Sequence, residues 1–160
     1  MTGVAGTPLT LSVTETNALG CVSVAGTATV MLPGLQFYTV IPCRVADTRV
    51  GSGFSSGYGT PSIGGGASRD FVVPGQCGIP AGAQAVSFNF TVWNTTSYGD
   101  FKIYPGGGTV STVSTLNWGP GMLALANAAV IPLGTTGAIT VVNEGPGTVD
   151  LFFDVNGYFQ

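Results

Sequence analysis

The stretch AVSFNFTVW, residues 85–93, decides the fold class because its side chains alternate between two kinds. Positions 86, 88, 90 and 92 are Val or Phe, whereas positions 87, 89 and 91 are Ser, Asn and Thr. A period of two residues is that of a β-strand with one buried face and one face in water. The stretch therefore predicts a strand of an antiparallel sheet that covers a core on one side.

The same alternation recurs along the chain between turns rich in Gly, Pro and Asn, whereas helix signals are nearly absent. Further strands are predicted at residues 9–15, 21–32, 35–41, 101–104, 138–143 and 148–158. Residues 122–131 are apolar on both faces, which predicts a fully buried strand, with a short helix as the alternative. About nine or ten consecutive strands predict an all-β antiparallel sandwich of jelly-roll or immunoglobulin-like type, with a barrel as the alternative.

The organisation changes near residue 33, and we expect two parts. Residues 1–33 hold two strands around the turn-rich segment TNALG, which predicts a β-hairpin, and residues 34–160 hold the sandwich. Because two strands alone are marginal in water, the hairpin is expected to pack on the same chain or to add to a neighbouring subunit. Residues 47–74 are rich in Gly and Ser and are expected to form a long connection without regular structure.

Charge is scarce, and this excludes several functions. The 160 residues include four Lys or Arg, seven Asp or Glu and no His, so 7% are charged, against about 25% in an average soluble domain. No basic cluster is available for nucleic acid, and no imidazole is available for a Ser–His triad or a His-ligated metal. The longest apolar run is too short for a membrane span, and the first residues do not form a secretory signal, so neither is expected within this chain.

Several phrases of the sequence, taken in order, carry a resemblance to a known family. They are PCRVADTR at 42–49, CGIP at 77–80, STLNW at 114–118 and DVNGYF at 154–159. From Phe37 onward the chain resembles a β-rich accessory module of secreted and cell-surface bacterial proteins. Residues 1–33 look like the last two strands of a preceding immunoglobulin-like repeat. The resemblance implies an extracellular, non-catalytic module that occurs beside wall-active enzymes or in tandem arrays.

The three cysteines divide into a pair and a single residue. Cys43 and Cys77 bracket the long connection, and a disulfide between them would close a loop of about 35 residues, stabilising the fold by up to about 3.8 kcal/mol in the chain-entropy model. A zinc site would lack further ligands at suitable spacing, so no metal site is expected there. Cys21 remains, either as a free thiol or as a cross-link between chains.

The charged residues do not predict a catalytic centre. Asp150 and Asp154 lie four positions apart on one predicted strand, so their backbones are about 13 Å apart, too far for the carboxylate pair of a glycoside hydrolase. We therefore expect no enzymatic activity. A structural ion pair, in which Asp154 or Asp47 binds Arg49 or Arg44, is expected to pin the long connection to the last strand.

Binding residues are less sharply indicated. The candidates for stacking on a sugar or for a contact between subunits are the aromatics Phe54, Tyr58, Trp93, Tyr98 and Trp118. No cofactor is expected, except that calcium could be held by Asp47 or Asp100 together with backbone carbonyls.

Together these patterns predict a non-catalytic structural module of a bacterial extracellular or cell-surface protein. Its expected partners are copies of itself, in an array or filament formed by β-strand addition, or adjacent domains of a surface protein. The alternative prediction is a carbohydrate-binding module for a cell-wall or environmental polysaccharide.

Overall fold

The computed structural model describes residues 8–31, 34–55 and 57–160, and over these residues it contains ten strands and no helix. The all-β prediction is therefore confirmed. Contacts divide the chain into two units, Met1–Gln36 and Phe37–Gln160, three residues beyond the boundary predicted from the sequence. The start of the chain at residues 1–7 and the end of the predicted strand at Leu32 lie outside the described residues.

The first unit is a β-hairpin. Strand β1 (Pro8–Val13) pairs antiparallel with β2 (Gly26–Met31), from Pro8 opposite Met31 to Val13 opposite Gly26. The predicted strands were longer, but the residues between β1 and β2 form a loop in which the only bridge joins Thr16 to Val22. The amide oxygen of Asn17 accepts hydrogen bonds from the N–H groups of Leu19 and Cys21 and so closes this loop instead of a longer ladder.

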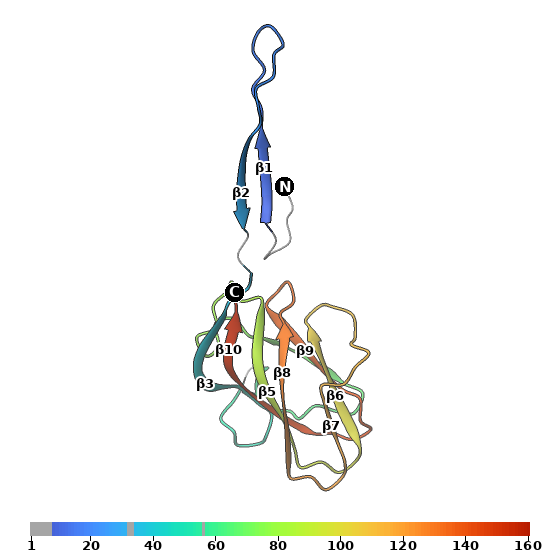
Figure 1. The fold of residues 1–160 in the computed structure, drawn as a ribbon. Helices are drawn as coiled ribbons and strands as arrows, with labels where there is room; N and C mark the ends of the chain where they lie inside the picture. The colour runs from blue at the N-terminus through green and yellow to red at the C-terminus, as the bar shows by residue number, and fades with distance from the viewer. Residues whose placement is uncertain (1–7, 32–33, 56) are drawn as a thin grey trace. The chain divides into compact units, whose positions relative to one another are not determined.

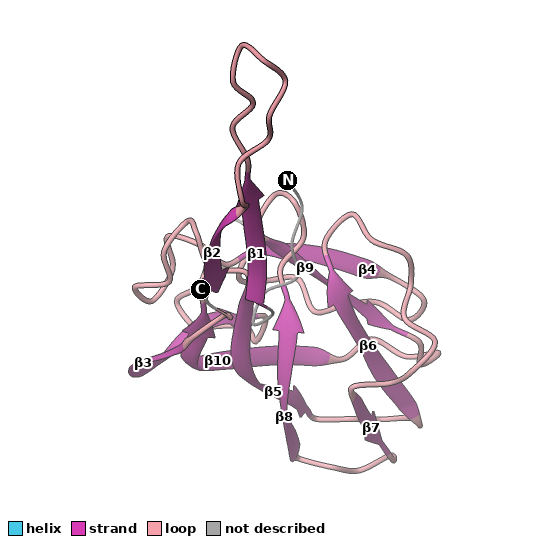
Figure 2. Cartoon of the chain, turned by 45° about the horizontal axis from the view of Figure 1, so that its top comes forward, coloured by secondary structure: helices cyan, strands magenta, loops and turns pink. Residues whose placement is uncertain are grey.

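The second unit is a sandwich of two four-stranded sheets (Figures 1 and 2). One sheet has the order β3-β10-β5-β8, formed by Phe37–Asp47, Asp150–Phe159, Ala85–Trp93 and Ala124–Pro132. The other has the order β4-β9-β6-β7, formed by Ser68–Val72, Ala138–Asn143, Gly99–Pro105 and Leu116–Trp118. Every described pairing is antiparallel and neither sheet closes on itself, so the prediction of an antiparallel sandwich is confirmed.

The core lies between the two sheets and is built by the alternation that the sequence displays. In β5 the side chains of Val86, Phe88, Phe90 and Val92 are fully buried. Phe153 of β10 meets them at the centre, with ring centroids 5.7 Å from Phe88 and 5.3 Å from Phe90. Burial of this apolar face is the main source of stability for the unit.

The prediction of a fully buried strand at residues 122–131 is wrong. Strand β8 is the last strand of its sheet, and within it only Ile131 is buried, whereas Val130 is 53% exposed. Its outward face carries mainly Ala, whose apolar character does not require burial because a single methyl group exposes little surface. An apolar pattern on both faces thus marks here an uncharged edge, not an interior strand.

The prediction that residues 47–74 lack regular structure is also wrong in part. Strand β4 occupies their C-terminal end and pairs with β9. Farther back, Ile63 and Val149 exchange two backbone hydrogen bonds, each 3.0 Å long, which fix the middle of the connection to the start of β10. β4 begins with Ser, Arg and Asp, so its first residues do not show the apolar alternation that is typical of a strand.

Candidate functional site: an arginine and carboxylate network on one sheet

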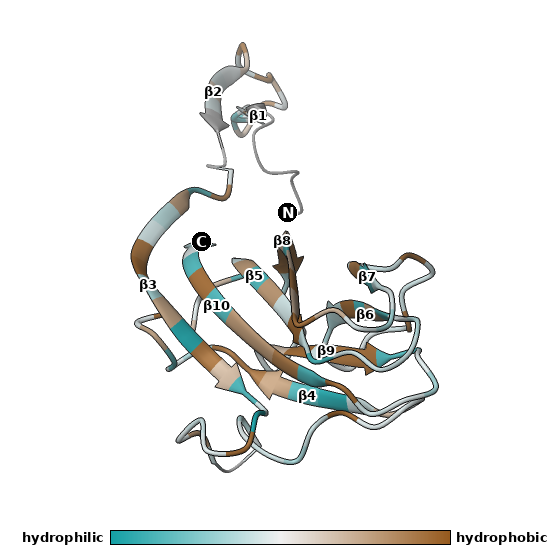
Figure 3. Cartoon of the chain, turned by 90° about the horizontal axis from the view of Figure 1, so that it is seen from below, coloured by the Kyte–Doolittle hydropathy of each residue, from teal (hydrophilic) through white to brown (hydrophobic). Residues whose placement is uncertain are grey.

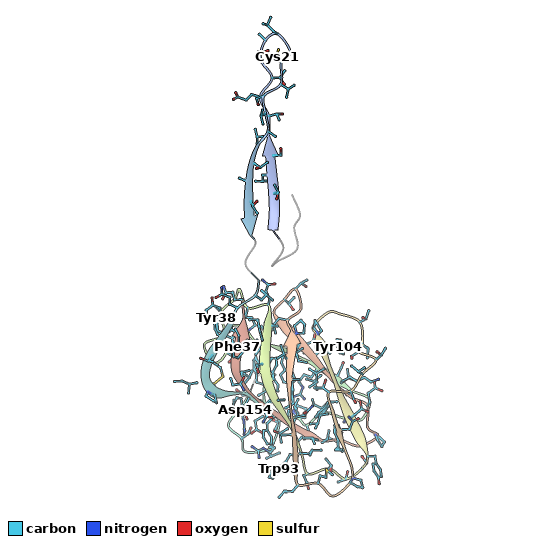
Figure 4. The ribbon with its side chains drawn as sticks, in the orientation of Figure 1. Cys21, Phe37, Tyr38, Trp93, Tyr104 and Asp154 are labelled. Atoms are coloured by element: carbon cyan, nitrogen blue, oxygen red, sulfur yellow. A yellow bond between two sulfur atoms is a disulfide. The ribbon has the colours of Figure 1, made fainter. Side chains whose placement is uncertain are left out.

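Arg44 and Asp154 face each other across β3 and β10 on the outer side of the first sheet. The Arg44 Nε and Nη2 atoms donate to the two carboxylate oxygens of Asp154 at 2.8 and 3.1 Å. This two-bond geometry is the strongest that an arginine and a carboxylate form. Figure 4 labels Asp154 in the middle part of the sheet. The pair joins two strands whose residues are 110 positions apart in the sequence.

Asp47 lies at the end of β3 and bridges two arginines. Its side chain is 3% exposed and accepts from Arg44 Nη1 at 3.1 Å and from Arg49 Nη2 at 2.6 Å. Arg49 adds a bond from Nε at 2.9 Å and one from its backbone N–H at 3.2 Å. These charged donors offset the cost of burying the Asp47 carboxylate. Removal of one arginine would leave the carboxylate with too few hydrogen-bond partners.

The pKa values of these groups keep the network charged. Burial raises the pKa of Asp47, but hydrogen bonds and the positive charge of Arg49, together with the bond from Arg44, outweigh burial and hold that pKa below its ordinary value. The hydrogen bond to Asp154 raises the pKa of Arg44, and the hydrogen bond to Asp47 raises the pKa of Arg49. Neither arginine can therefore act as a proton donor near neutral pH.

Two aromatic rings complete the network. The guanidinium carbons of Arg44 and Arg49 each lie 4.2 Å from the centroid of the Phe152 ring, and Arg49 also lies 5.0 Å from the centroid of Trp93. Such contacts are attractive because the ring face carries negative potential. The face of Trp93 that Arg49 contacts is thus occupied within the chain, and it is not free for a sugar ring.

A second group of hydrogen bonds ties the long connection to the start of β10. Asp150 Oδ1 accepts from the hydroxyls of Thr48 at 3.0 Å and Ser62 at 2.6 Å. The Thr48 hydroxyl oxygen also accepts from the N–H of Leu151 at 2.9 Å. These carboxylates therefore position backbone segments, and no unengaged acid and base stand together in this network.

The remaining predicted aromatics do not form one platform. Trp118 is buried in the core, with its ring 4.7 Å from that of Phe101, because its strand β7 turns it inward. The Tyr58 hydroxyl donates to the Val72 carbonyl oxygen at 2.8 Å, and Phe54 is half-buried in the same connection. Only Tyr98, at 76% exposure, presents most of its ring to solvent among these five residues.

The disulfide between Cys43 and Cys77 is present and joins β3 to the turn before β5, as predicted. Cys21 is an exposed free thiol in the hairpin loop. Among the described residues no group of three or more His, Cys, Asp or Glu side chains is placed to hold a metal ion. Asp47, one of the two calcium candidates, is bound to arginines, and Asp100 has one buried oxygen that accepts no hydrogen bond.

Phe152, Thr48 and Ser62 belong to the network, but sequence reasoning missed them. A signal for Phe152 existed, because it is the one aromatic residue on the otherwise polar face of residues 150–156. Thr48 and Ser62 carried no comparable signal, since a hydroxyl in a Gly- and Ser-rich connection is typical of any loop.

The ionised side chain of Asp47 is expected to make the stability of the wild type depend on pH. Because its folded-state pKa is lowered, ionised Asp47 stabilises the fold above its unfolded-state pKa near about 4, and this stabilisation is lost as the pH falls through the folded value. Asp47→Asn should lower the free energy of unfolding by about 2 kcal/mol near neutral pH, and by less in acid. The measurement is urea unfolding of the wild type and of Asp47→Asn at several pH values from neutral to acid.

Arg49→Lys is the matched control for this prediction. It keeps the positive charge beside Asp47 but cannot form the two-bond fork, so an intermediate loss of stability is expected. A difference between wild type and Asp47→Asn that stays constant from neutral to acid pH would show that the Asp47 charge does not stabilise the fold.

Comparison with known proteins adds no assignment to this geometry. No protein-family model matches the chain, and no curated protein matches it at a significant level. In the described part of the chain there is no helix with the length and hydropathy needed to cross a bilayer.

Proposed function

We propose that this chain is a non-catalytic structural module of a bacterial extracellular or cell-surface protein. In this proposal the hairpin of residues 8–31 adds to a sheet of a neighbouring subunit, and repetition of this step builds an array or filament. Strand addition of this kind uses main-chain hydrogen bonds for affinity and side-chain pockets for specificity.

The observation that carries the proposal is the hairpin itself. It forms a separate unit of two strands, and its described side chains are exposed apart from Leu11, which is half-buried. Apolar side chains are among them, with Val13 at 68% and Val24 at 95% exposure. An isolated two-stranded ribbon is marginal in water, so a ribbon of this composition favours association with a further sheet.

The distribution of charge supports association as well. Nine of the eleven charged side chains are engaged in hydrogen bonds or ion pairs within residues 37–160, and only Glu15 and Asp100 are not. Residues 103–143 contain no charged residue at all. A surface with so little free charge offers weak electrostatic opposition to contact between copies.

The disulfide and the network support an extracellular, non-catalytic role. A disulfide between Cys43 and Cys77 is typical of an oxidising compartment. The carboxylates of Asp47, Asp150 and Asp154 are each bound to donors that hold strands and loops together. Polysaccharide binding, the alternative, has less support because the guanidinium of Arg49 lies over the Trp93 ring.

The proposal is tested with the full chain and a variant that cannot donate a strand. Leu11 and Ala28 face each other in the hairpin ladder, so Leu11→Pro with Ala28→Pro removes an N–H from each strand. The wild type should increase in mass with concentration in sedimentation experiments and form polymers visible by electron microscopy. The double variant should remain a monomer with an unchanged melting temperature, since the sandwich has its own core.

Ala28→Thr is the control, because it keeps the N–H and adds a side chain common in strands. It should polymerise like the wild type. A wild-type chain that stays monomeric up to its solubility limit would overturn the proposed function.

A further inference from the structure

Among the described residues, strand β8 pairs with β5 alone, and the segment before β7 contacts it through a hydrogen bond from the Asn127 side-chain amide to the Thr115 carbonyl oxygen at 2.6 Å. The backbone edge of β8 away from β5 has no described strand beside it. Natural edge strands are blunted by charges, prolines, bulges, shortness or a covering segment. β8 has nine residues, no charge, an unbroken register with β5, and a proline only at its last position, Pro132. In Figure 3 it carries hydrophobic colours.

The other three edges are protected. β7 has three residues, and β4 has five, which include Arg69 and Asp70. β3 contains Pro42 and register shifts against β10, and at its end the N–H of Asp47 already donates to the Tyr58 carbonyl oxygen at 2.9 Å. β8 is therefore the edge of this sandwich most open to a further strand.

The backbone groups that would pair can be identified from the hydrogen bonds that flank β8. The N–H of Asn94 donates to the Leu123 carbonyl oxygen at 3.0 Å, and the N–H of Leu133 donates to the Gln84 carbonyl oxygen at 2.8 Å. Odd-numbered residues thus direct their N–H and C=O groups to β5, and even-numbered residues direct theirs to the free edge. Within the described residues, none of the even-numbered N–H groups from 124 to 130 donates a hydrogen bond.

The side chains at the same positions leave room for a partner. Ala124, Ala126, Ala128 and Val130 are exposed. Small side chains allow a neighbouring strand with larger residues to approach to the usual separation of about 4.8 Å without a clash. No charge on this strand would have to be desolvated by the approach.

The hairpin of a second copy fits this edge. Within residues 8–31, β1 and β2 pair only with each other, so each has a second edge without a described partner strand, and neither contains a charged residue. Each of these strands has six residues, one fewer than the seven from Ala124 to Val130. Because the donor and the acceptor are different surfaces of one chain, the contact is head-to-tail and can repeat without closing.

We propose that the free edge of β8 is the acceptor for the hairpin of a second copy, which extends the sheet β3-β10-β5-β8 by further strands. This inference rests on the proposed function and names the surface through which the module assembles. The occupant is another copy of this chain, bound through its main chain at residues 124–130.

The first test is Ala128→Pro in the full chain. Its N–H points to the free edge, so the variant removes a donor to the incoming strand and leaves the ladder to β5 intact. The dissociation constant of the subunit contact should rise about tenfold or more, with the sandwich still folded. Ala128→Val, which keeps the N–H, should assemble like the wild type.

A second pair of variants guards against misfolding of the proline variant. Ala128 and Asn89 are direct neighbours on β8 and β5. Ala128→Lys places a charge at the edge, where charges oppose pairing, and should weaken assembly. Asn89→Lys places the same charge one strand inward on the same face and should weaken it much less.

Mixing two assembly-deficient chains separates this inference from the proposed function. Leu11→Pro with Ala28→Pro lacks a donor but keeps β8, whereas Ala128→Pro keeps the donor and lacks the acceptor. Each alone should be monomeric, and the mixture should give a one-to-one complex that does not grow, as measured by light scattering.

If the hairpin variant abolishes polymers and both Ala128→Pro and Ala128→Lys do not, the β8 acceptor is overturned while the proposed function stands. If the β8 variants abolish polymers and the hairpin variant does not, β8 binds another surface, and both are overturned. A monomeric wild type also overturns both.

Discussion

Phe153→Ala is expected to lower the free energy of unfolding of the sandwich by about 4 kcal/mol. The Phe153 side chain is fully buried and is the ring around which both sheets meet, with centroids 5.1 Å from Phe71 and 5.3 Å from Phe90. Truncation removes apolar contacts on every side and leaves a cavity, because rings from β4 and β5 cannot all move to fill it.

The measurement is urea unfolding of the full chain followed by fluorescence, with wild type and variant fitted to the same m-value. Phe37→Ala is the matched control, since the Phe37 side chain is 47% exposed and packs on one ring, that of Phe159. It should cost about 1 kcal/mol. Equal losses for the two variants would show that the two sheets do not meet at Phe153.

Removal of the disulfide is expected to have an effect of similar size. Cys43 and Cys77 are 34 positions apart, and release of this loop in the unfolded chain should lower the free energy of unfolding by about 4 kcal/mol in the chain-entropy model. The bond also anchors β3, an outer strand whose ladder to β10 is broken by register shifts. The outer strand is thus held at a place where its backbone pairing is irregular.

Cys43→Ala with Cys77→Ala, and wild type treated with a reductant, should show the same loss of melting temperature. Cys21→Ala serves as the control and should leave the melting temperature unchanged, because Cys21 is a free thiol outside the sandwich. An oxidised and a reduced chain that melt together would contradict the predicted contribution.

Phe153 and the disulfide both stabilise the sandwich, which in the proposed assembly accepts the hairpin of a neighbour. A subunit that adds its hairpin to a neighbour must keep its two sheets packed together while the edge of β8 remains accessible to another strand. Core packing around Phe153 and the link between Cys43 and Cys77 satisfy this requirement independently of the hairpin. Variants of residues 8–31 should therefore change assembly without a matching change in the stability of the sandwich.

The sequence alone determined the fold class, most strands and the disulfide. Alternation in residues 85–93 assigns each side chain to a face, because the geometry of a strand turns successive side chains to opposite sides. The same local rule predicted the apolar face of β10. The positions of Cys43 and Cys77 on either side of the long connection predicted the disulfide between them.

Only the tertiary structure decided which strands lie at the edges and which charges meet. Residues 122–131 looked like an interior strand, yet they form an edge, because alternation carries no information about the order of strands in a sheet. Arg44 and Asp154 meet through a pairing that spans 110 positions, and Phe152 enters their network only once β3 lies beside β10. Faces follow from local stereochemistry, whereas neighbours follow from long-range packing of the whole chain.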